Sequence, residues 1–158
     1  RLVHAMPERI HAHWLQAYGR KIGIAQATPA DEPLIIGLLE RMANNRADFT
    51  NTFRGLSDGA PRDQFLDPAA FDAWEGDWRT RLEREDDPTA TMRAANPVYI
   101  PRNHRVEQMI QSAVAGDFAP FDRLLNVLSR PFEAQAGADD LTRPPEPSEV
   151  VQQTFCGT

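Results

Sequence analysis

The sequence predicts an all-α protein, an irregular array of short helices that ends in an extended C-terminal strap. Three observations predict this fold class. Apolar residues recur at intervals of three and four through most of the chain, and no stretch of strand length alternates cleanly between apolar and polar residues. In addition, 13 prolines divide the 158 residues into short segments.

The first predicted helix covers residues 7–19 and ends at Gly19. A second helix begins near Thr28, a favourable N-cap, with Pro29 at its first position. The predicted buried faces are Ile10, Trp14, Ala17 and Tyr18 in the first helix, and Leu34, Ile35, Leu38, Leu39 and Met42 in the second. Each set falls on one side of a helix.

The third and fourth predicted helices follow directly. The third carries Phe49, Thr52, Phe53 and Leu56 on one side and ends within residues 55–59. The fourth opens at Asp67 and Pro68 and places Phe71, Trp74, Trp78 and Leu82 at intervals of three, four and four. Two tryptophans and one phenylalanine on one stripe would bury about 400–700 Å². We interpret this stripe as core and not as an aromatic ligand site.

Three further helices are predicted. Residues 89–95 form a short one, which ends at Asn96 because the residue before a proline avoids helical backbone. Asn103 caps the next, which Gly116 closes, and the last runs over residues 120–129. The predicted buried faces are Val106, Met109, Ile110, Ala113 and Val114 in the former, and Phe121, Leu124, Leu125 and Leu128 in the latter.

From Glu133 onward the helical pattern fades, and a cluster of prolines at residues 144–147 favours polyproline geometry. We therefore expect residues 1–132 to form a helical region and residues 133–158 to form a proline-rich tail that carries Cys156. From Gly137 the tail is expected to be a strap or a mobile arm. Val150, Val151 and Phe155 are its candidate anchors.

Charge and composition argue against two classes of partner. Seventeen Lys and Arg against 23 Asp and Glu give a formal net charge of −6, the wrong sign for binding nucleic acid or an anionic membrane. No apolar run reaches the roughly 20 residues of a membrane span. Because Cys156 is the only cysteine, we expect a reducing compartment, the cytoplasm. The start at Arg1, without Met or a signal peptide, indicates a piece of a longer protein.

Few residues offer chemistry of their own. The sequence contains no Gly-rich phosphate loop and no kinase-type lysine and metal-binding motifs. Lys21 is the only lysine, and its place after a helix favours an interaction with the helix dipole. His11 and His13 point about 200° apart on a helix, so they are poorly placed to share a metal ion. Cys156 is either an inert tail thiol or a thiol placed for redox exchange.

Several segments, taken in order, resemble the selenoprotein O (YdiU) family. They are residues 14–24, 38–56, 92–104 and 151–158, so the resemblance covers essentially the whole chain. Its more specific parts are the group Asp48, Thr50, Phe53, Arg54 and Leu56, and the pairs Asn96–Pro97 and Arg102–Asn103. On this resemblance the chain is similar to the C-terminal region only.

The resemblance implies a protein-kinase-like fold that binds ATP in an inverted pose with Mg²⁺ or Mn²⁺. Such proteins transfer AMP to Ser, Thr or Tyr hydroxyls of other proteins. The ligands for ATP and metal belong to motifs N-terminal to this segment, so we expect no catalytic, cofactor-binding or metal-binding residue here. The expected partners are the N-terminal kinase-like part of the same protein and, for the whole protein, its protein substrates.

The resemblance assigns a role to one residue, Cys156, and three other matched residues are given a physical interpretation. Cys156 lies three positions from the C-terminus, where animal members carry selenocysteine, and this implies a redox-regulatory link to a cysteine of the kinase-like part. Arg54 is expected to pair with a carboxylate or a carbonyl. Together with Arg102 and Asn103, it is expected to act as a structural latch against the kinase-like core.

Two other interpretations stay open from the sequence. The chain could be a free-standing helical module that binds partners through an apolar groove or through its proline-rich arm. It could also be an independent enzyme that uses Cys156 as a nucleophile. The first expectation remains a helical segment of a protein adenylyltransferase that is inactive by itself.

Overall fold

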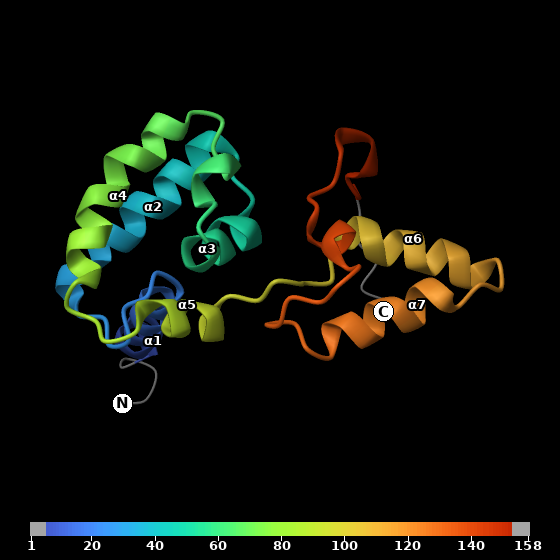
Figure 1. Ribbon diagram of the computed structural model, residues 1–158, viewed down its shortest axis with the longest axis horizontal. Helices are drawn as coiled ribbons and strands as arrows, with labels where there is room; N and C mark the ends of the chain where they lie inside the picture. Colours follow the sequence, from blue (N-terminus) through green and yellow to red (C-terminus); the bar gives the residue numbers. More distant parts are fainter. Residues whose placement is uncertain (1–5, 153–158) are drawn as a thin grey trace. The chain divides into compact units, whose positions relative to one another are not determined.

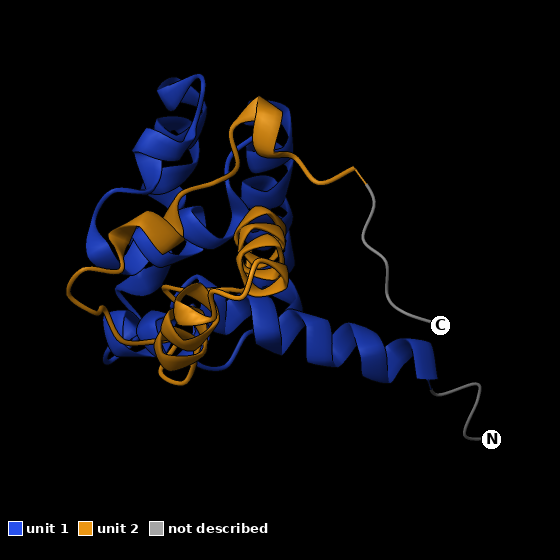
Figure 2. Ribbon diagram, turned by 90° about the vertical axis from the view of Figure 1, so that its right-hand side faces the viewer, with its two compact units in different colours: residues 1–96 blue, residues 97–158 orange. Residues whose placement is uncertain are grey.

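The computed structural model describes residues 6–152, and the chain divides into two compact units, Arg1–Asn96 and Pro97–Thr158 (Figure 2). The described residues form seven α-helices and four short 3-10 helices, and no strand occurs among them. The all-α fold class expected from the sequence is thus confirmed. The two compact units meet in the sequence after residue 96. The boundary expected from the sequence, after residue 132, separates a helical region from a proline-rich tail and is a boundary of a different kind.

The first unit contains five α-helices within its described residues (Figure 1). They are α1 (Met6–Lys21), α2 (Glu32–Asn45), α3 (Phe49–Asp58), α4 (Pro68–Leu82) and α5 (Pro88–Ala95), with the 3-10 helices η1 (Pro29–Asp31) and η2 (Pro61–Gln64). Helix α2 packs along α4, α3 packs against α5 and η2, and α5 also contacts α1. Residues far apart in the sequence therefore share one core.

Aspartates fix the starts of three of these helices. The side chain of Asp48 accepts a hydrogen bond from the Asn51 N–H at 2.8 Å, and Asp67 and Asp87 accept from residues 69 and 90 in the same way. Such caps satisfy N–H groups that have no partner inside the helix. Thr28, the predicted cap, is the N-cap of η1, with Pro29 as its first residue, and α2 begins only at Glu32.

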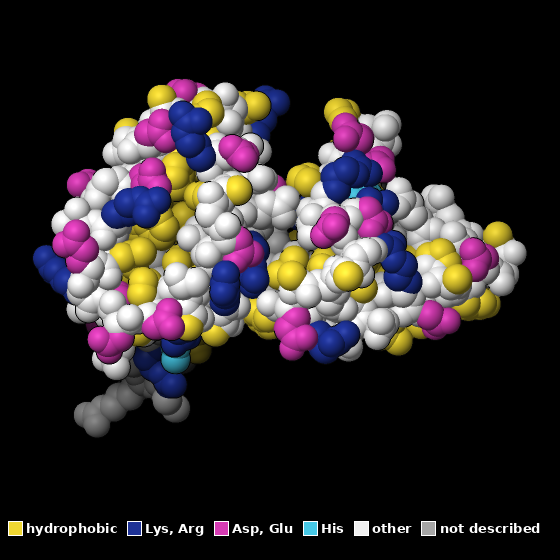
Figure 3. Space-filling model, in the orientation of Figure 1, with side chains coloured by type: hydrophobic (Ala, Val, Ile, Leu, Met, Phe, Trp, Pro, Cys, Tyr) yellow, Lys and Arg dark blue, Asp and Glu magenta, His cyan; other side chains and the backbone are white. Residues whose placement is uncertain are grey.

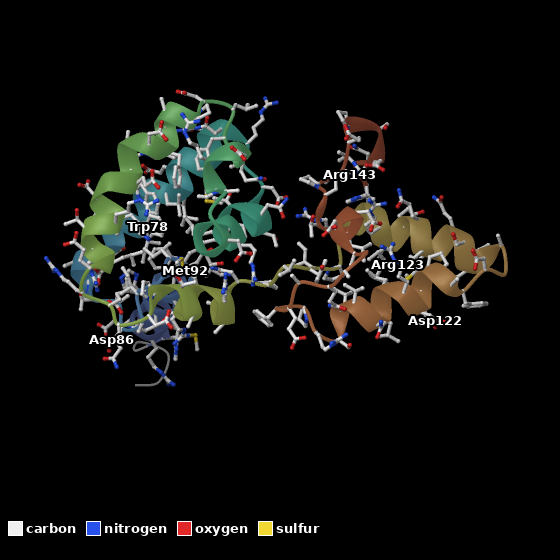
Figure 4. All side chains as sticks on the ribbon, viewed as in Figure 1. Trp78, Asp86, Met92, Asp122, Arg123 and Arg143 are labelled. Atoms are coloured by element: carbon white, nitrogen blue, oxygen red, sulfur yellow. The ribbon has the colours of Figure 1, made fainter. Side chains whose placement is uncertain are left out.

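The aromatic stripe of α4 forms the centre of the first unit. Phe71, Trp74 and Trp78 are all buried and Leu82 is partly buried, which confirms the predicted core face. Trp78 is labelled in Figure 4. The two indole rings stack 5.2 Å apart, and each N–H has a partner, the carbonyl of Leu34 for Trp74 and that of Ile22 for Trp78. A buried indole thus loses no hydrogen bond on folding.

The predicted face of α1 is correct at two residues and wrong at two. Trp14 and Tyr18 are partly buried and pack against the core, whereas Ile10 is 62% exposed and Ala17 is exposed. The buried residues of the helix are Leu15 and Gly19. The helix does not stop at Gly19 but continues to Lys21. Gly19 instead permits close packing, since a Cβ there would lie 2.5 Å from the Cβ of Ala27. Only the C-terminal half of α1 rests on the unit, so periodicity along the whole helix was misleading.

In α3 the prediction holds except at one residue. Thr52, Phe53 and Leu56 are buried, but Phe49 is 44% exposed. Phe49 is the first residue of the helix, and its ring contacts those of Tyr18 and Phe53. In α2, the predicted Ile35, Leu38 and Met42 are buried.

The second unit contains the α-helices α6 (Asn103–Val114) and α7 (Ala119–Leu128) and the 3-10 helices η3 (Asp139–Thr142) and η4 (Pro147–Glu149). Its core consists of Tyr99, Leu124, Val127, Ala138 and Leu141. Ala138 and Leu141 come from the proline-rich tail. Part of that tail therefore completes a core, since a two-helix hairpin alone buries little apolar surface.

Four residues predicted to face inward in α6 and α7 are exposed instead: Ile110, Val114, Phe121 and Leu125. The core of the second unit covers only part of the apolar faces of α6 and α7. The other apolar residues of these two helices are therefore exposed within the unit. Asn103 is the first helical residue of α6, and the N-cap position belongs to Arg102. The predicted cap is thus displaced by one residue.

Of the three tail anchors considered from the sequence, Val150 is 47% exposed and Val151 is partly buried. Phe155 and Cys156 lie outside the described residues. Among residues 6–152, no helix has both the length and the apolar character needed to cross a bilayer.

Candidate functional site

A buried polar residue of the first unit, Asn96, directly follows α5 and is only 1% exposed. Its main-chain N–H donates to the carbonyl of Met92 at 2.9 Å, the last hydrogen bond of the helix. Its side-chain Nδ2 donates to the carbonyls of Lys21 at 2.8 Å and Phe53 at 3.1 Å. One amide therefore satisfies main-chain groups at the end of α1 and inside α3.

Lys21 closes the same junction from α1. Its Nζ donates to the Oδ1 of Asn96 and to the carbonyl of Ala95, each at 3.3 Å. The ammonium also lies 5.6 Å from the ring centroid of Phe49 and 5.4 Å from that of Phe53, within cation–π range. Burial lowers the pKa of Lys21 from its ordinary value. Its position at the helix C-terminus was expected, whereas these partners were not.

Arg54 brings the third helix into the junction. Its Nε donates to the carboxylate of Asp58 at 2.6 Å, and its Nη1 donates to the carbonyl of Asn96 at 3.2 Å. The expected pairing of Arg54 with a carboxylate or a carbonyl is confirmed on both counts. We call Lys21, Arg54 and Asn96 the α1–α3–α5 junction.

The other predicted site residues lie elsewhere. Arg102 is 8% exposed, and Asn103 is exposed. Both belong to the second unit, whereas Arg54 belongs to the first. Cys156 lies outside the described residues. The sequence analysis identified Asn96 as a helix end and as part of the Asn96–Pro97 pair of the family resemblance, but it assigned no role to the Asn96 side chain. Neither signal identifies the partners of that side chain, since nothing local marks a partner 75 residues away.

A second polar group surrounds His104 in α6. His104 is 3% exposed, and within the described residues its Nε2 has no hydrogen-bond partner. Burial, followed by the charge of Arg105, lowers the pKa of His104. The ring borders a cavity of about 500 Å³ between α6 and residues 148–151. A hydrogen bond from Arg143 (Figure 4) and one from the N–H of Glu146 lower the pKa of nearby Glu149 to about 2.

Two observations concern metal and phosphate ligands among the described residues. No three His, Cys, Asp or Glu side chains within residues 6–152 gather into a metal-binding group. The one lysine, Lys21, is engaged with Asn96 and Ala95 and is not directed at a phosphate site. Figure 3 shows acidic and basic side chains interspersed over the visible faces of the units. Lys21, Arg54 and Asn96 form a structural junction between helices.

Comparison with known proteins shows that this chain is similar in sequence to protein nucleotidyltransferases. It is 57% identical over 157 residues to a protein nucleotidyltransferase YdiU from a Ruegeria species, and 55% identical to the protein of that name from Ruegeria pomeroyi. A Rhizobium johnstonii protein of the same name is 48% identical over 165 aligned residues, which include 96% of this chain. No protein-family model matches the chain.

The chain thus matches the YdiU family of protein nucleotidyltransferases, the family that its motifs resemble, along 99% of its length in the two Ruegeria proteins. It spans about a third of the length of these relatives (33% in each).

Proposed function

We propose that this chain is the C-terminal helical part of a longer protein nucleotidyltransferase, which transfers AMP from ATP to Ser, Thr or Tyr hydroxyls of proteins. The observation that carries the proposal is the 57% identity over 157 residues to a protein named for nucleotidyl transfer. The AMP group, the hydroxyl acceptors and a kinase-like catalytic lobe follow from the resemblance of the motifs. The cytoplasm is the proposed compartment.

In this proposal the chain supports the catalytic lobe and is inactive alone. ATP and Mg²⁺ or Mn²⁺ would bind in the part of the relatives that the chain does not match, about two thirds of their length. The engagement of Lys21 in the α1–α3–α5 junction supports this division, because the lysine is held by the fold. Arg54, Arg102 and Asn103 are proposed as latches toward the catalytic lobe.

Calorimetric titration with ATP and Mg²⁺ tests the division. The isolated chain should show no binding, while the intact Ruegeria sp. relative should bind ATP under the same conditions. Micromolar binding by the isolated chain would contradict the proposal.

The proposed latch role of Arg102 can be separated from a catalytic role. The suitable protein is a chimera in which this chain replaces the matched third of the Ruegeria sp. relative. Arg102→Ala, which removes a side chain that is 8% exposed, should lower the melting temperature of the chimera more than its rate of AMP transfer. An unchanged melting temperature with a lost rate would rule out the latch.

Cys156 is proposed to form a disulfide with a cysteine of the catalytic lobe. The two thiols would lose two electrons and two protons to an oxidant such as oxidised glutathione. AMP transfer by the chimera should then change on oxidation and recover with dithiothreitol, whereas Cys156→Ser should make it insensitive. Equal sensitivity of both proteins would show that Cys156 has no such role.

The second candidate function is that of a free-standing helical interaction module. The exposed apolar residues of α1, α6 and α7 favour it. The intact mass of the native gene product distinguishes the two candidate functions. A mass near 17.8 kDa would favour the module, and a much larger mass would favour the nucleotidyltransferase.

A further inference from the structure

The N-terminal half of α1 is largely uncovered within the first unit. Every residue from position 6 to position 13 is exposed, and the first buried residue of the helix is Leu15. In Figure 2 this half of α1 runs outward from the rest of its unit. Isolated helical turns of this length are marginal in water, because tertiary packing supplies most of the stability of helices in proteins.

The exposed half carries an apolar stripe. Met6, Ile10 and Trp14 follow one another at intervals of four and so lie along one side of the helix. Met6 is 53% exposed and Ile10 is 62% exposed. Ile36 of α2, 39% exposed, borders the same hollow, whose volume is about 790 Å³. We call this hollow the α1–α2 groove.

Two polar residues hold one edge of the groove. The Nε2 of His11 lies 3.2 Å from the carboxylate of Glu32, which joins α1 to α2. The imidazole also stacks on the indole of Trp14, with ring centroids 5.9 Å apart and planes 17° apart. The groove is therefore formed before any partner arrives, which reduces the ordering that binding would require.

We propose that the α1–α2 groove docks an apolar helical segment from the remaining two thirds of the longer nucleotidyltransferase. This inference rests on the proposed function and names the surface through which the chain would support the catalytic lobe. The matched relatives carry about two thirds of their length beyond this chain. In such a protein the occupant is covalently attached, so its effective concentration at the groove is high.

The chemistry of the groove defines its occupant. Its apolar floor and walls fit side chains at the i, i+3 and i+4 positions of an amphipathic helix. The polar edge is already paired between His11 and Glu32, so the occupant needs no charged group there. An apolar face of that kind also removes Met6 and Ile10 from water.

Amide hydrogen exchange in unmodified proteins tests the docking. The isolated chain and the intact Ruegeria sp. relative, aligned over 157 residues, would be compared at the positions that match residues 6–14. These amides should exchange at least about tenfold more slowly in the intact relative. The positions of α4 are the internal control, because α4 is packed within the first unit in the isolated chain. Equal exchange at residues 6–14 would overturn the proposal.

A pair of variants tests the same surface through stability. Ile10→Asp should lower the melting temperature of the chimera by several degrees and leave that of the isolated chain unchanged, since Ile10 is exposed there. Leu66→Asp is the matched control, because Leu66 is 77% exposed in the same unit but lies outside the groove. Equal effects of Ile10→Asp and Leu66→Asp in the chimera would contradict docking at the groove.

Two further outcomes separate the alternatives. If residues 6–14 of the isolated chain become protected as its concentration rises, a second copy occupies the groove and the proposal fails. AMP transfer measured on the same relative reports on the proposed function independently. Protection of residues 6–14 without AMP transfer would contradict the proposed function but not the docking proposal. AMP transfer without this protection would contradict the docking proposal but not the proposed function.

Discussion

The side-chain amide of Asn96 donates a hydrogen bond to the carbonyl of Lys21, 2.8 Å away and 75 residues earlier in the chain. The ammonium of Lys21 returns a hydrogen bond to the Oδ1 of Asn96 at 3.3 Å. This reciprocal pair joins the end of α1 to the end of α5. Since Asn96 is also the last residue of the first unit, the pair fixes the point at which the chain leaves that unit.

Asn96→Ala should destabilise the first unit by about 2–4 kcal/mol, because it leaves the carbonyls of Lys21 and Phe53 without their donor. Chemical denaturation followed by circular dichroism measures this loss. Asn44→Ala is the matched control, since Asn44 is exposed on α2 and should cost less than about 1 kcal/mol. Similar losses for both variants would show that the junction contributes little.

Gly55→Ala and Gly76→Ala should change stability in opposite directions. A Cβ at Gly55 would lie 2.9 Å from the main chain of Pro61, so alanine forces η2 away from α3. At Gly76 a Cβ meets nothing within 4 Å, and alanine should stabilise α4 by about 0.5–1 kcal/mol. Melting temperatures of the two variants check the signs, and a stabilised Gly55→Ala would contradict the packing of α3 on η2.

The ion pair of Asp31 with Arg81 should make stability depend on acid pH. Burial alone would raise the pKa of Asp31, but hydrogen bonds from Arg81 and Thr28 outweigh it and lower the pKa. The folded state therefore favours the carboxylate. Its stabilising contribution is complete above about pH 4, the ordinary pKa in unfolded chains, and is lost as the pH falls through the lower folded-state value.

Asp31→Asn should thus lower the free energy of unfolding at pH 7 by about 2–4 kcal/mol, because Arg81 is largely buried beside it. The decline of that free energy between about pH 5 and 2.5 should be shallower than in the unmodified chain. Asp77→Asn, an exposed change on α4, is the control and should have little effect at pH 7. Parallel pH profiles for the Asp31→Asn variant and the unmodified chain would rule out this linkage.

The first unit should fold without the second. The buried apolar residues of its core all lie between Leu15 and Met92, so a fragment of residues 1–98 retains the complete core and the α1–α3–α5 junction. It should unfold cooperatively on heating. A fragment of residues 1–87 lacks α5 and Asn96 and should lose cooperative unfolding. A non-cooperative transition in the longer fragment would contradict the division after Asn96.

Periodicity predicted the fold where a helix packs along its whole length. In α4 the residues Phe71, Trp74 and Trp78 are buried as expected, since α4 is packed against α2 and the rest of the first unit. In α1 and α7 the same reasoning placed Ile10 and Leu125 inside, and both are exposed. An apolar stripe predicts that one face of a helix packs against other apolar residues. It does not predict that those residues belong to this chain.

The candidate site was predicted only in part. Arg54 was expected to hold a carboxylate or a carbonyl, and it holds Asp58 and the carbonyl of Asn96. The Lys21–Asn96 pair could not be predicted, because it depends on how α1 and α5 pack and no local pattern encodes that packing. Asn103 was expected to cap α6, but the N-cap is Arg102, one position earlier.

In the proposed function this chain is a supporting part of a protein nucleotidyltransferase. Incorporation of radiolabelled AMP into protein checks this proposal with three samples: the chimera, the Ruegeria sp. relative without its matched third, and this chain alone. We expect incorporation by the chimera only. AMP transfer by this chain alone, or undiminished transfer by the relative without its matched third, would contradict the claim.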